Sequence, residues 1–405
     1  MNRASSHESV AISIEGNDKV ETTLRALLSA VITLTLGILG SSVLPVPFAF
    51  SRTGVLLGML TAVVVASANC HTSVLVLRAA GKTGHDSYEG VAEAVGGRRL
   101  KVLTQVSLIL LLFGTIVGDF ALISDVAARA LDKLTYPAEP PSWLLNGDGR
   151  ALMAIIAVLL VFPLCCLRRM RSLEMAAAAG VAVIAVIISM VVYTALHAGL
   201  PAIRSGELPL WGMKVTKDLP EAFAVLGFAF YLQPMMMPLL HEMPAGDLGV
   251  QLTSTAVRIV VPGVALAVYC VLGVFAAARF GLDTQGDMLL NSWVGGKWEG
   301  VVDLAMTVYL SISIPPMQMS LRYTVDCMLA GEDALYNRKR HICETVGILV
   351  PCLMVAMVFP AYAEKIFAIT GATAVCLVCY VIPVAIHLRM YYDSKRPMQF
   401  IGCIE

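Results

Sequence analysis

The sequence predicts an all-α membrane protein with about ten transmembrane helices. We expect two inverted halves of five helices, in which the first helix of each half, helix 1 and helix 6, is broken. Of the 405 residues, 58% are hydrophobic and only 14% are charged, and the mean hydropathy is +0.77. A soluble domain carries about 25% charged residues, so this composition indicates a lipid environment. Ten long apolar stretches and two matching interruptions rich in Gly and Pro complete the prediction.

Ten stretches are long and apolar enough to cross a bilayer, which takes about 20 residues of helix. The predicted spans are 24–50, 54–78, 101–130, 150–167, 174–198, 220–241, 256–279, 301–329, 342–360 and 364–390. The first five spans form one half and the last five form the other. The predicted segments are a disordered tail at 1–23, the halves at 24–198 and 220–390, an extracytoplasmic loop at 199–219 and a tail at 391–405.

The basic residues predict the orientation of these spans. If the N-terminus is cytoplasmic, 19 of the 29 Lys and Arg residues lie in cytoplasmic segments. Cytoplasmic loops are enriched in Lys and Arg, so we expect both terminal tails in the cytoplasm. Basic and acidic residues are equal in number, at 29 each. A nucleic-acid partner is therefore not expected, because phosphate binding needs a basic surplus.

Two interruptions lie at corresponding positions of the two halves. The first is "LGILGSSVLPVPFAF" at 36–50, and the second is "GFAFYLQPMMMP" at 227–238. An odd number of helices in each half inverts the second half relative to the first. Matching interruptions of this kind indicate a binding site near the membrane midplane of an inverted-repeat transporter.

Proline explains what such an interruption offers to a ligand. It has no N–H and cannot bond the carbonyl four residues earlier, so Pro45, Pro47 and Pro234 leave carbonyls free. Amides at the start of a half-helix attract a carboxylate, and carbonyls at the end of one attract a cation. An interrupted helix therefore offers a partner to both ends of an α-amino acid. Simple proline kinks without a ligand are the alternative interpretation.

These motifs resemble the amino acid/auxin permease superfamily. "GSSVLPVPFAFSRTGVLLG" resembles its first helix, "GFAFYLQPMMMPLLHEM" its sixth and "IFAITGATAVCLVCYVIP" its tenth. The chain is most similar to the sodium-coupled neutral amino acid transporters of solute carrier family 38, and "FPLCCLRRMRSLEMAAAAG" resembles that family's tenth member. The resemblance implies the leucine-transporter-like fold, with helices 1 and 6 unwound around an amino-acid substrate. The family usually has eleven spans and ten are predicted here, so either the eleventh helix is absent or the sequence is a fragment of a longer protein.

The resemblance also implies which residues bind the substrate. These are Gly40, Ser41, Ser42, Val43, Phe230, Tyr231 and Gln233. In the first interruption, the backbone amides are expected to hold the substrate carboxylate. The residues of the second interruption are expected near the substrate's amino group and side chain.

Transport in this family is coupled to an ion, and we expect sodium or protons in that role, with no other cofactor and no metal site. The residues considered for ion coupling are Leu36, Leu39, Ser311, Ser313 and Asp119. The family commonly has Asn where this chain has Leu36, so one sodium ligand is lost, while backbone carbonyls near Leu36 and Leu39 remain. Asp119 places a carboxylate near mid-membrane, where a charge is costly and functional by default. It could carry a coupling proton, pair with a cationic substrate, or be a neutral Asp bonded to a neighbouring helix.

The sequence therefore predicts a secondary active transporter of neutral or small amino acids, embedded in the lipid bilayer. Either the plasma membrane or an endomembrane of the vacuolar or lysosomal kind is expected. An enzyme is not expected, since "GGRR" at 96–99 lacks the ending of a phosphate-binding loop and no nucleophile motif is present. The ten cysteines lack the paired spacing of a zinc site. The alternative function is a membrane sensor or receptor that binds an amino acid without transporting it.

Overall fold

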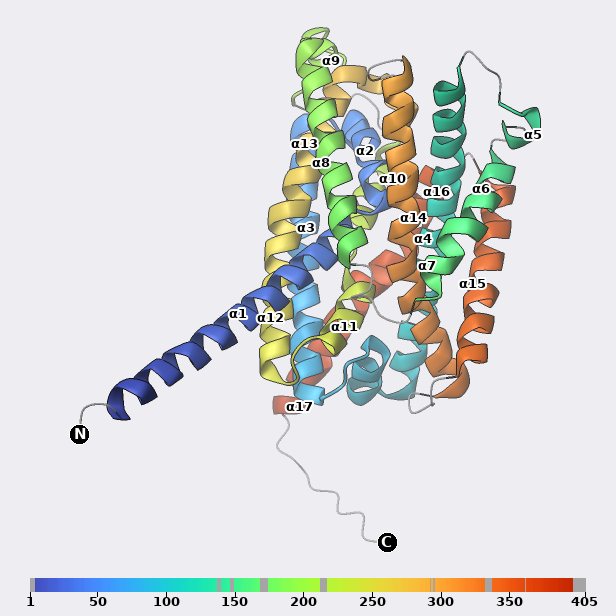
Figure 1. Ribbon diagram of the computed structural model, residues 1–405. Coiled ribbons are helices and arrows are strands. Elements are labelled where there is room, and N and C mark those ends of the chain that lie inside the picture. Colours follow the sequence, from blue (N-terminus) through green and yellow to red (C-terminus); the bar gives the residue numbers. More distant parts are fainter. Residues whose placement is uncertain are drawn as a thin grey trace.

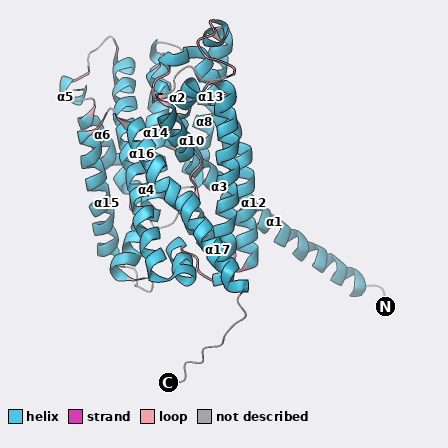
Figure 2. Ribbon diagram, turned by 180° about the vertical axis from the view of Figure 1, so that it is seen from behind, coloured by secondary structure: helices cyan, strands magenta, loops and turns pink. Residues whose placement is uncertain are grey.

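The computed structural model describes residues 4–136, 140–145, 149–167, 174–211, 217–291, 293, 296–331, 337–360 and 362–395. In this part of the chain every regular element is helical. The long helices lie side by side in one bundle, as Figure 1 and the reverse view in Figure 2 show. The predicted all-α membrane class is thereby confirmed.

The chain up to residue 204 contains the long helices α1, α3, α4 and α8. Its elements are α1 (Ala4–Leu39), η1 (Ser41–Val43), α2 (Val46–Thr53), α3 (Val55–Thr83), α4 (Tyr88–Thr135), α5 (Ser142–Leu145), α6 (Arg150–Ile156), the π segment η2 (Ala157–Val161), α7 (Phe162–Cys165), α8 (Glu174–His197) and α9 (Pro201–Arg204).

The rest of the chain, from Leu219 onward, is also helical. Its elements are α10 (Leu219–Ala229), α11 (Gln233–Glu242), α12 (Asp247–Ile259), the π segment η4 (Val260–Ala265), α13 (Leu266–Phe280), η5 (Gly281–Asp283), η6 (Met288–Leu290), α14 (Gly296–Ala330), α15 (Arg338–Val358), α16 (Ala363–Thr370), the π segment η7 (Gly371–Val381) and α17 (Ile382–Lys395).

Within the described residues, nine helical segments are long and apolar enough to cross a membrane, so the protein is a multi-pass membrane protein. The predicted span at 150–167 corresponds to the shorter apolar helix Arg150–Cys165. This helix is shorter than the roughly 20 residues of a usual span, which explains why nine long segments stand against ten predicted ones.

The ends of the described chain differ in detail from the predicted tails. Helix α1 begins at Ala4, within the segment 1–23 that we expected to be disordered, and Figure 1 shows it extending away from the bundle. At the other end α17 continues to Lys395, and residues 396–405 lie outside the described residues. The predicted loop at 199–219 contains α9, and its residues 212–216 are also outside the described part.

Glycine and serine set the boundary between α3 and α4. Gly84 ends α3 in the left-handed region, at φ 72°, where a residue without a side chain is favoured. Ser87 then caps α4, because its hydroxyl accepts a hydrogen bond from the Gly90 N–H at 3.0 Å. Gly97 has φ 70° within α4, so the helix kinks there. A short first section, residues 88–96, is thus set off from the section that crosses the membrane.

Close helix contacts hold the bundle together. α4 packs along α14 more extensively than any other pair of elements. Small residues allow other helices to approach one another, as is usual in membranes. The Cα of Gly371 lies so close to α10 that an added Cβ would fall on the carbonyl oxygen of Ala224. Gly118 of α4 lies in the same way against the ring of Phe367 in α16.

Candidate functional site

The first interruption separates α1 from α2. After Leu39 the chain forms the 3₁₀ turn η1, in which Leu44 N–H donates to the carbonyl of Ser41 at 3.1 Å. Pro45 precedes α2, and Pro47 lies in its first turn. Ser41, Ser42 and Val43 are all buried. The residues expected to hold a substrate carboxylate therefore lie in a non-α-helical turn within the bundle.

The second interruption separates α10 from α11. Phe230 and Leu232 have backbone angles outside the helical range, and α11 begins at Gln233 with Pro234 in its first turn. Phe230, Tyr231, Leu232 and Gln233 are at most 2% exposed. The three predicted residues Phe230, Tyr231 and Gln233 thus lie at this interruption and inside the protein.

Tyr269 of α13 connects the two interruptions. Its hydroxyl donates to the carbonyl of Ala229, the last residue of α10, at 2.8 Å. It also contacts the carbonyl of Ile38 at the end of α1, and it lies 2.7 Å from the Ser42 hydroxyl. Ser42 in turn donates to the Ile38 carbonyl at 2.8 Å. The hydroxyl groups of Ser42 and Tyr269 therefore supply hydrogen bonds to the last carbonyls of α1 and α10. Without these bonds the carbonyls would be buried and unpaired, which is unfavourable in a membrane interior.

Asp119 of α4 lies next to the first interruption and is fully buried. Its carboxylate interacts electrostatically with the hydroxyl groups of Ser41, Tyr231 and Tyr309. Even so, neither carboxylate oxygen has a hydrogen bond of ordinary distance and angle in the described part of the chain. The Tyr309 hydroxyl is likewise without a hydrogen-bond partner among the described residues. The structure thus brings Asp119 together with predicted residues of both interruptions.

Gln233 points toward α3 and η7. Its amide oxygen accepts from the Leu232 N–H at 3.2 Å and from the Cys379 thiol at 2.8 Å. Its amide nitrogen lies 3.4 Å from the Thr72 hydroxyl and 3.5 Å from the Asn69 side-chain oxygen. These contacts hold α11 against α3 and η7 at the point where the chain resumes its helix.

The residues considered for sodium lie on two neighbouring elements. Leu36 and Leu39 are buried near the end of α1, and the carbonyl of Leu36 accepts from the Gly40 N–H at 3.0 Å. Ser311 and Ser313 are buried in α14, where their hydroxyls donate to carbonyls of their own helix at 2.7 and 2.8 Å. A Cβ added at Gly40 would lie 3.5 Å from the terminal methyl group of Met317, so this region of α14 packs close to the first interruption.

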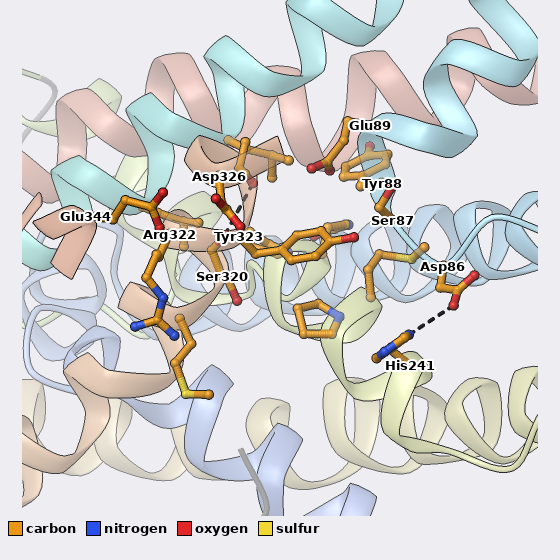
Figure 3. Close-up of a pocket in the computed structure, with 18 of the residues that line it drawn as sticks. Asp86, Ser87, Tyr88, Glu89, His241, Ser320, Arg322, Tyr323, Asp326 and Glu344 are labelled. Atoms are coloured by element: carbon orange, nitrogen blue, oxygen red, sulfur yellow. Dashed lines mark hydrogen bonds and ion pairs between the residues drawn. The ribbon is translucent and has the colours of Figure 1, made fainter. Parts of the chain in front are cut away.

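A cavity of about 250 Å³ leads from one end of the bundle to Gln233. The start of α4, α11, the last turns of α14 and the start of α15 form its walls, as Figure 3 shows. The ring nitrogen Nδ1 of His241 lies 3.0 Å from the carboxylate of Asp86, and both side chains are more than half exposed. Since the cavity reaches the residue that opens α11, it gives this end of the protein a path toward the second interruption.

Arg322 and His341 stabilise the wall of this cavity. Arg322 of α14 is buried and donates to the carbonyl of Cys165, the Thr345 hydroxyl and the Gln318 side chain, at 3.0, 3.2 and 3.3 Å. His341 lies 3.3 Å from the neighbouring carbonyl of Cys166. The Arg322 cation near the carbonyl end of a helix is favourable. The short helix α6–α7 is thereby fixed to α14 and α15.

The opposite end of the bundle is covered by the segment 281–293. Met288 donates its N–H to the carbonyl of Leu44 in the first interruption at 3.2 Å, and both residues are fully buried. Glu207 holds the start of the segment by accepting from the Leu282 N–H at 2.8 Å. Trp293 holds its end by donating to the Met288 carbonyl at 2.9 Å. The segment is therefore a cover over the first interruption.

Ion pairs fasten α4 to α14 at this covered end. Arg129 donates to the carboxylate of Asp303 at 3.0 and 3.1 Å, and Lys133 lies 2.8 Å from Glu299. Asp287 of the cover is buried, and its carboxylate accepts from the Leu289 N–H at 2.9 Å. Burial raises the pKa of Asp287 to about 6, and the nearby carboxylates of Asp303 and Glu364 add to this rise.

Sequence reasoning missed Tyr269 and the ion pairs of the covered end. One signal for Tyr269 was available: it is a tyrosine within the apolar stretch "VALAVYCVLG", and a buried tyrosine hydroxyl usually has a partner. The identity of that partner depends on how α13 packs against both interruptions. The pairing of Arg129 with Asp303 depends in the same way on the contact between α4 and α14.

The sequence profile of the transmembrane amino acid transporter protein family matches residues 25–403. The chain belongs to this family. It is 24% identical over 381 residues to amino acid transporter AVT6E of Arabidopsis thaliana, which covers 90% of this chain and 76% of that protein. It is 21% identical over 389 residues to sodium-coupled neutral amino acid symporter 2 of Danio rerio, with the same coverage. It is 21% identical over 385 residues to solute carrier family 38 member 10 of Homo sapiens, covering 90% of this chain and 33% of that protein.

Membership in this family confirms the resemblance on which the sequence predictions depend. Transporters of amino acids, including members of solute carrier family 38, are its relatives. The protein is therefore a membrane transporter by family and not an enzyme.

Proposed function

We propose that this protein is a secondary active transporter of neutral or small amino acids. In this proposal it has a leucine-transporter-like arrangement of two inverted five-helix halves, and it works by alternating access around the interrupted helices 1 and 6. Family membership supports amino acids as the substrate class. The tails are cytoplasmic in this proposal, since the basic residues are biased toward their side. The plasma membrane or a vacuolar or lysosomal membrane is the proposed location.

The observation that carries the proposal is the contrast between the two ends of the bundle. A cavity reaches Gln233 from one end, while the segment 281–293 covers the first interruption at the other end. A transporter that exposes its site to one side at a time needs this asymmetry, and transport then requires the opposite arrangement as well. With cytoplasmic tails, as proposed, the cavity of the described conformation would open toward the cytoplasm.

The interruptions supply the groups that an α-amino acid needs. Amides around Ser41, Ser42 and Val43 are the proposed partners of the substrate carboxylate, because amides at a helix start favour an anion. The carbonyl ends near Ala229 and Phe230 favour the ammonium group. The substrate side chain then lies near Tyr231, and tight packing there favours small side chains.

Two coupling ions fit the site. For proton coupling, Asp119 carries the proton, because a buried carboxylate without a bonded partner needs a proton or a cation to offset its burial. For sodium coupling, the carbonyls near Leu36 and Leu39 and the oxygens of Ser311 and Ser313 form the site, without the side-chain ligand that Leu36 cannot provide.

Counterflow into proteoliposomes tests the function. Vesicles loaded with an unlabelled amino acid are expected to accumulate the same labelled amino acid, and a panel of amino acids gives the substrate class. Binding of an amino acid without counterflow, at set sodium and pH, would instead support the alternative function, a sensor that does not transport.

A pH gradient separates the two coupling ions. With proton coupling, an inward proton gradient drives uptake without sodium, and Asp119→Asn abolishes this drive. The matched control is Asp132→Asn, which removes an exposed carboxylate from the same helix and is expected to leave the drive intact. Uptake that requires sodium and is unchanged by Asp119→Asn would overturn the proton mechanism.

A further inference from the structure

A second hollow, of about 530 Å³, opens on the outer surface of the bundle between α4, α15 and α16. Its rim includes Phe359 and Ile369, which are 49% and 67% exposed. Nearly all of its lining is apolar, and the hydroxyl of Thr370 is already bonded to the carbonyl of Ile366 at 2.7 Å. The hollow lies on membrane-spanning segments, so it faces hydrocarbon rather than water.

Glycine at position 114 gives the hollow its depth. An added Cβ at Gly114 would fall on the Thr370 hydroxyl, so α4 and α16 approach closely here and no side chain fills the space above their contact. Val117, one turn further along α4, is buried at the same wall. The floor is thus formed by two tightly packed helices and does not depend on flexible side chains.

A cation and a phenol lie at one end of the hollow. Lys365 and Tyr362 lie at the junction where one spanning segment ends at Val358 and the next begins at Ala363, which places them at the membrane boundary. The Lys365 ammonium lies 4.8 Å from the centre of the Tyr362 ring. Among the described residues Lys365 forms no ion pair within 4 Å. The carboxylate of the neighbouring Glu364 lies against Gly286 and interacts with Lys365 only at longer range.

We propose that this hollow binds a phospholipid with a net negative head group. One acyl chain lies in the hollow between α4 and α16, and the phosphate is held by the Lys365 ammonium and the Tyr362 hydroxyl at the boundary. An apolar hollow open to the bilayer fits a hydrocarbon chain, and a lysine ammonium at the boundary attracts a phosphate of opposite charge. In the orientation proposed above, this end lies on the extracytoplasmic side, so the lipid belongs to that leaflet. A sterol would present only a hydroxyl group to Lys365 and leave its charge unused.

The bound lipid would support the wall of the candidate site. Phe367 of α16 lies behind the hollow against Gly118 and stacks on Phe228 at 4.7 Å between ring centres. Phe228 lies 5.0 Å from the ring of Tyr231 at the second interruption. A ligand that binds only the folded protein stabilises it, so the lipid raises the unfolding temperature.

Lipid titration of the purified protein tests the proposal, with thermal unfolding and native mass spectrometry as readouts. The probes are palmitoyl-oleoyl phosphatidylglycerol, phosphatidylcholine with the same chains, and cholesterol. Phosphatidylglycerol is expected to raise the unfolding temperature most and to remain bound. Lys365→Gln removes the charge that holds the phosphate and should weaken binding of phosphatidylglycerol about fivefold.

Two variants make the test specific. Lys297→Gln removes an exposed lysine at the start of α14 and is expected to leave binding unchanged. Val355→Trp places a large side chain in the hollow from a partly exposed position and is expected to remove binding of both phospholipids. Equal stabilisation by both phospholipids, a preference for cholesterol, or an unchanged lipid preference in Lys365→Gln would overturn the proposal.

Discussion

At the scale of single residues, the hydroxyl of Tyr269 connects two segments that are far apart in the sequence. It contacts carbonyls at the ends of both α1 and α10, together with the Ser42 hydroxyl. Those carbonyls have no next helical turn to bond them, so the two hydroxyls take over that task. The relative position of the two interruptions therefore depends on one phenol.

Removal of this hydroxyl is expected to destabilise the fold. Tyr269→Phe leaves buried carbonyls with fewer donors, at a cost of about 1–3 kcal/mol. Tyr309→Phe is the matched control, since that buried hydroxyl has no hydrogen-bond partner in the described part of the chain. Thermal unfolding in detergent should show a lower midpoint for Tyr269→Phe and little change for Tyr309→Phe. Equal midpoints for the two variants would contradict the role of Tyr269.

At this scale the positions of the two interruptions followed from the prolines, whereas the roles of the residues in them stay predictions. Pro45, Pro47 and Pro234 locate both interruptions, and the structure has non-α-helical backbone at 40–45 and 230–232. The neighbourhood of Asp119 was not predictable, because its contacts with Ser41 and Tyr231 depend on where α4 lies in the bundle. Burial of a carboxylate at membrane depth was predictable from its position in an apolar span, whereas the absence of a bonded partner was not.

At the scale of elements, apolar length predicted most of the spanning segments, and proline accounts for irregularity within them. Three π segments lie at prolines: η4 contains Pro262, η2 comes just before Pro163 and η7 just before Pro383. A proline lacks the N–H for the usual bond and clashes with the preceding turn, and a wider turn relieves both problems. Periodicity could not locate these segments, since a π turn changes the backbone pattern without changing the apolar composition.

The contact between α10 and η7 gives an element-scale prediction. An added Cβ at Gly371 would fall on the Ala224 carbonyl oxygen and 2.9 Å from the Phe228 Cβ, so Gly371→Ala forces the two helices apart. Overpacking of this kind costs about 1–3 kcal/mol. Gly227→Ala makes the same change within α10, where nothing lies within 4 Å of the new Cβ.

Thermal unfolding of both glycine variants checks this contact. Gly371→Ala is expected to unfold at a lower temperature than the unmodified protein. Gly227→Ala should unfold at the same or a higher temperature, because alanine favours a helix over glycine. If Gly371→Ala is as stable as Gly227→Ala, the two helices do not approach as closely as described.

At the scale of the whole molecule, one end is covered and the other contains the cavity. Asp287 lies in the cover, outside the spanning segments, and burial raises its pKa to about 6 from an ordinary 3.8. A raised pKa means that the folded protein binds the proton more tightly than the unfolded chain does. This carboxyl therefore favours folding as the pH falls from about 7 to 4, and it opposes folding as the pH rises through that range.

A pH series of unfolding temperatures tests this relation. From pH 7.5 to pH 5, the unmodified protein is expected to gain more stability than Asp287→Asn, which cannot titrate at this position. Asp283→Asn is the control, because Asp283 is an exposed carboxylate in the same cover. The pH response of Asp283→Asn should match that of the unmodified protein. Identical pH responses in all three proteins would show that Asp287 is not buried in the cover.

The central proposal is that the substrate binds at the first interruption, and Ser42→Trp tests it most directly. Ser42 is 2% exposed and lies in η1, so a tryptophan there would occupy the space proposed for the substrate carboxylate. The matched control is Ser189→Trp, at an exposed position of α8. The measurement is counterflow of a labelled amino acid into proteoliposomes, with monodisperse protein of each variant. Loss of counterflow in Ser42→Trp with retention in Ser189→Trp is the expected result, and counterflow by Ser42→Trp at the unmodified rate would contradict the proposed site.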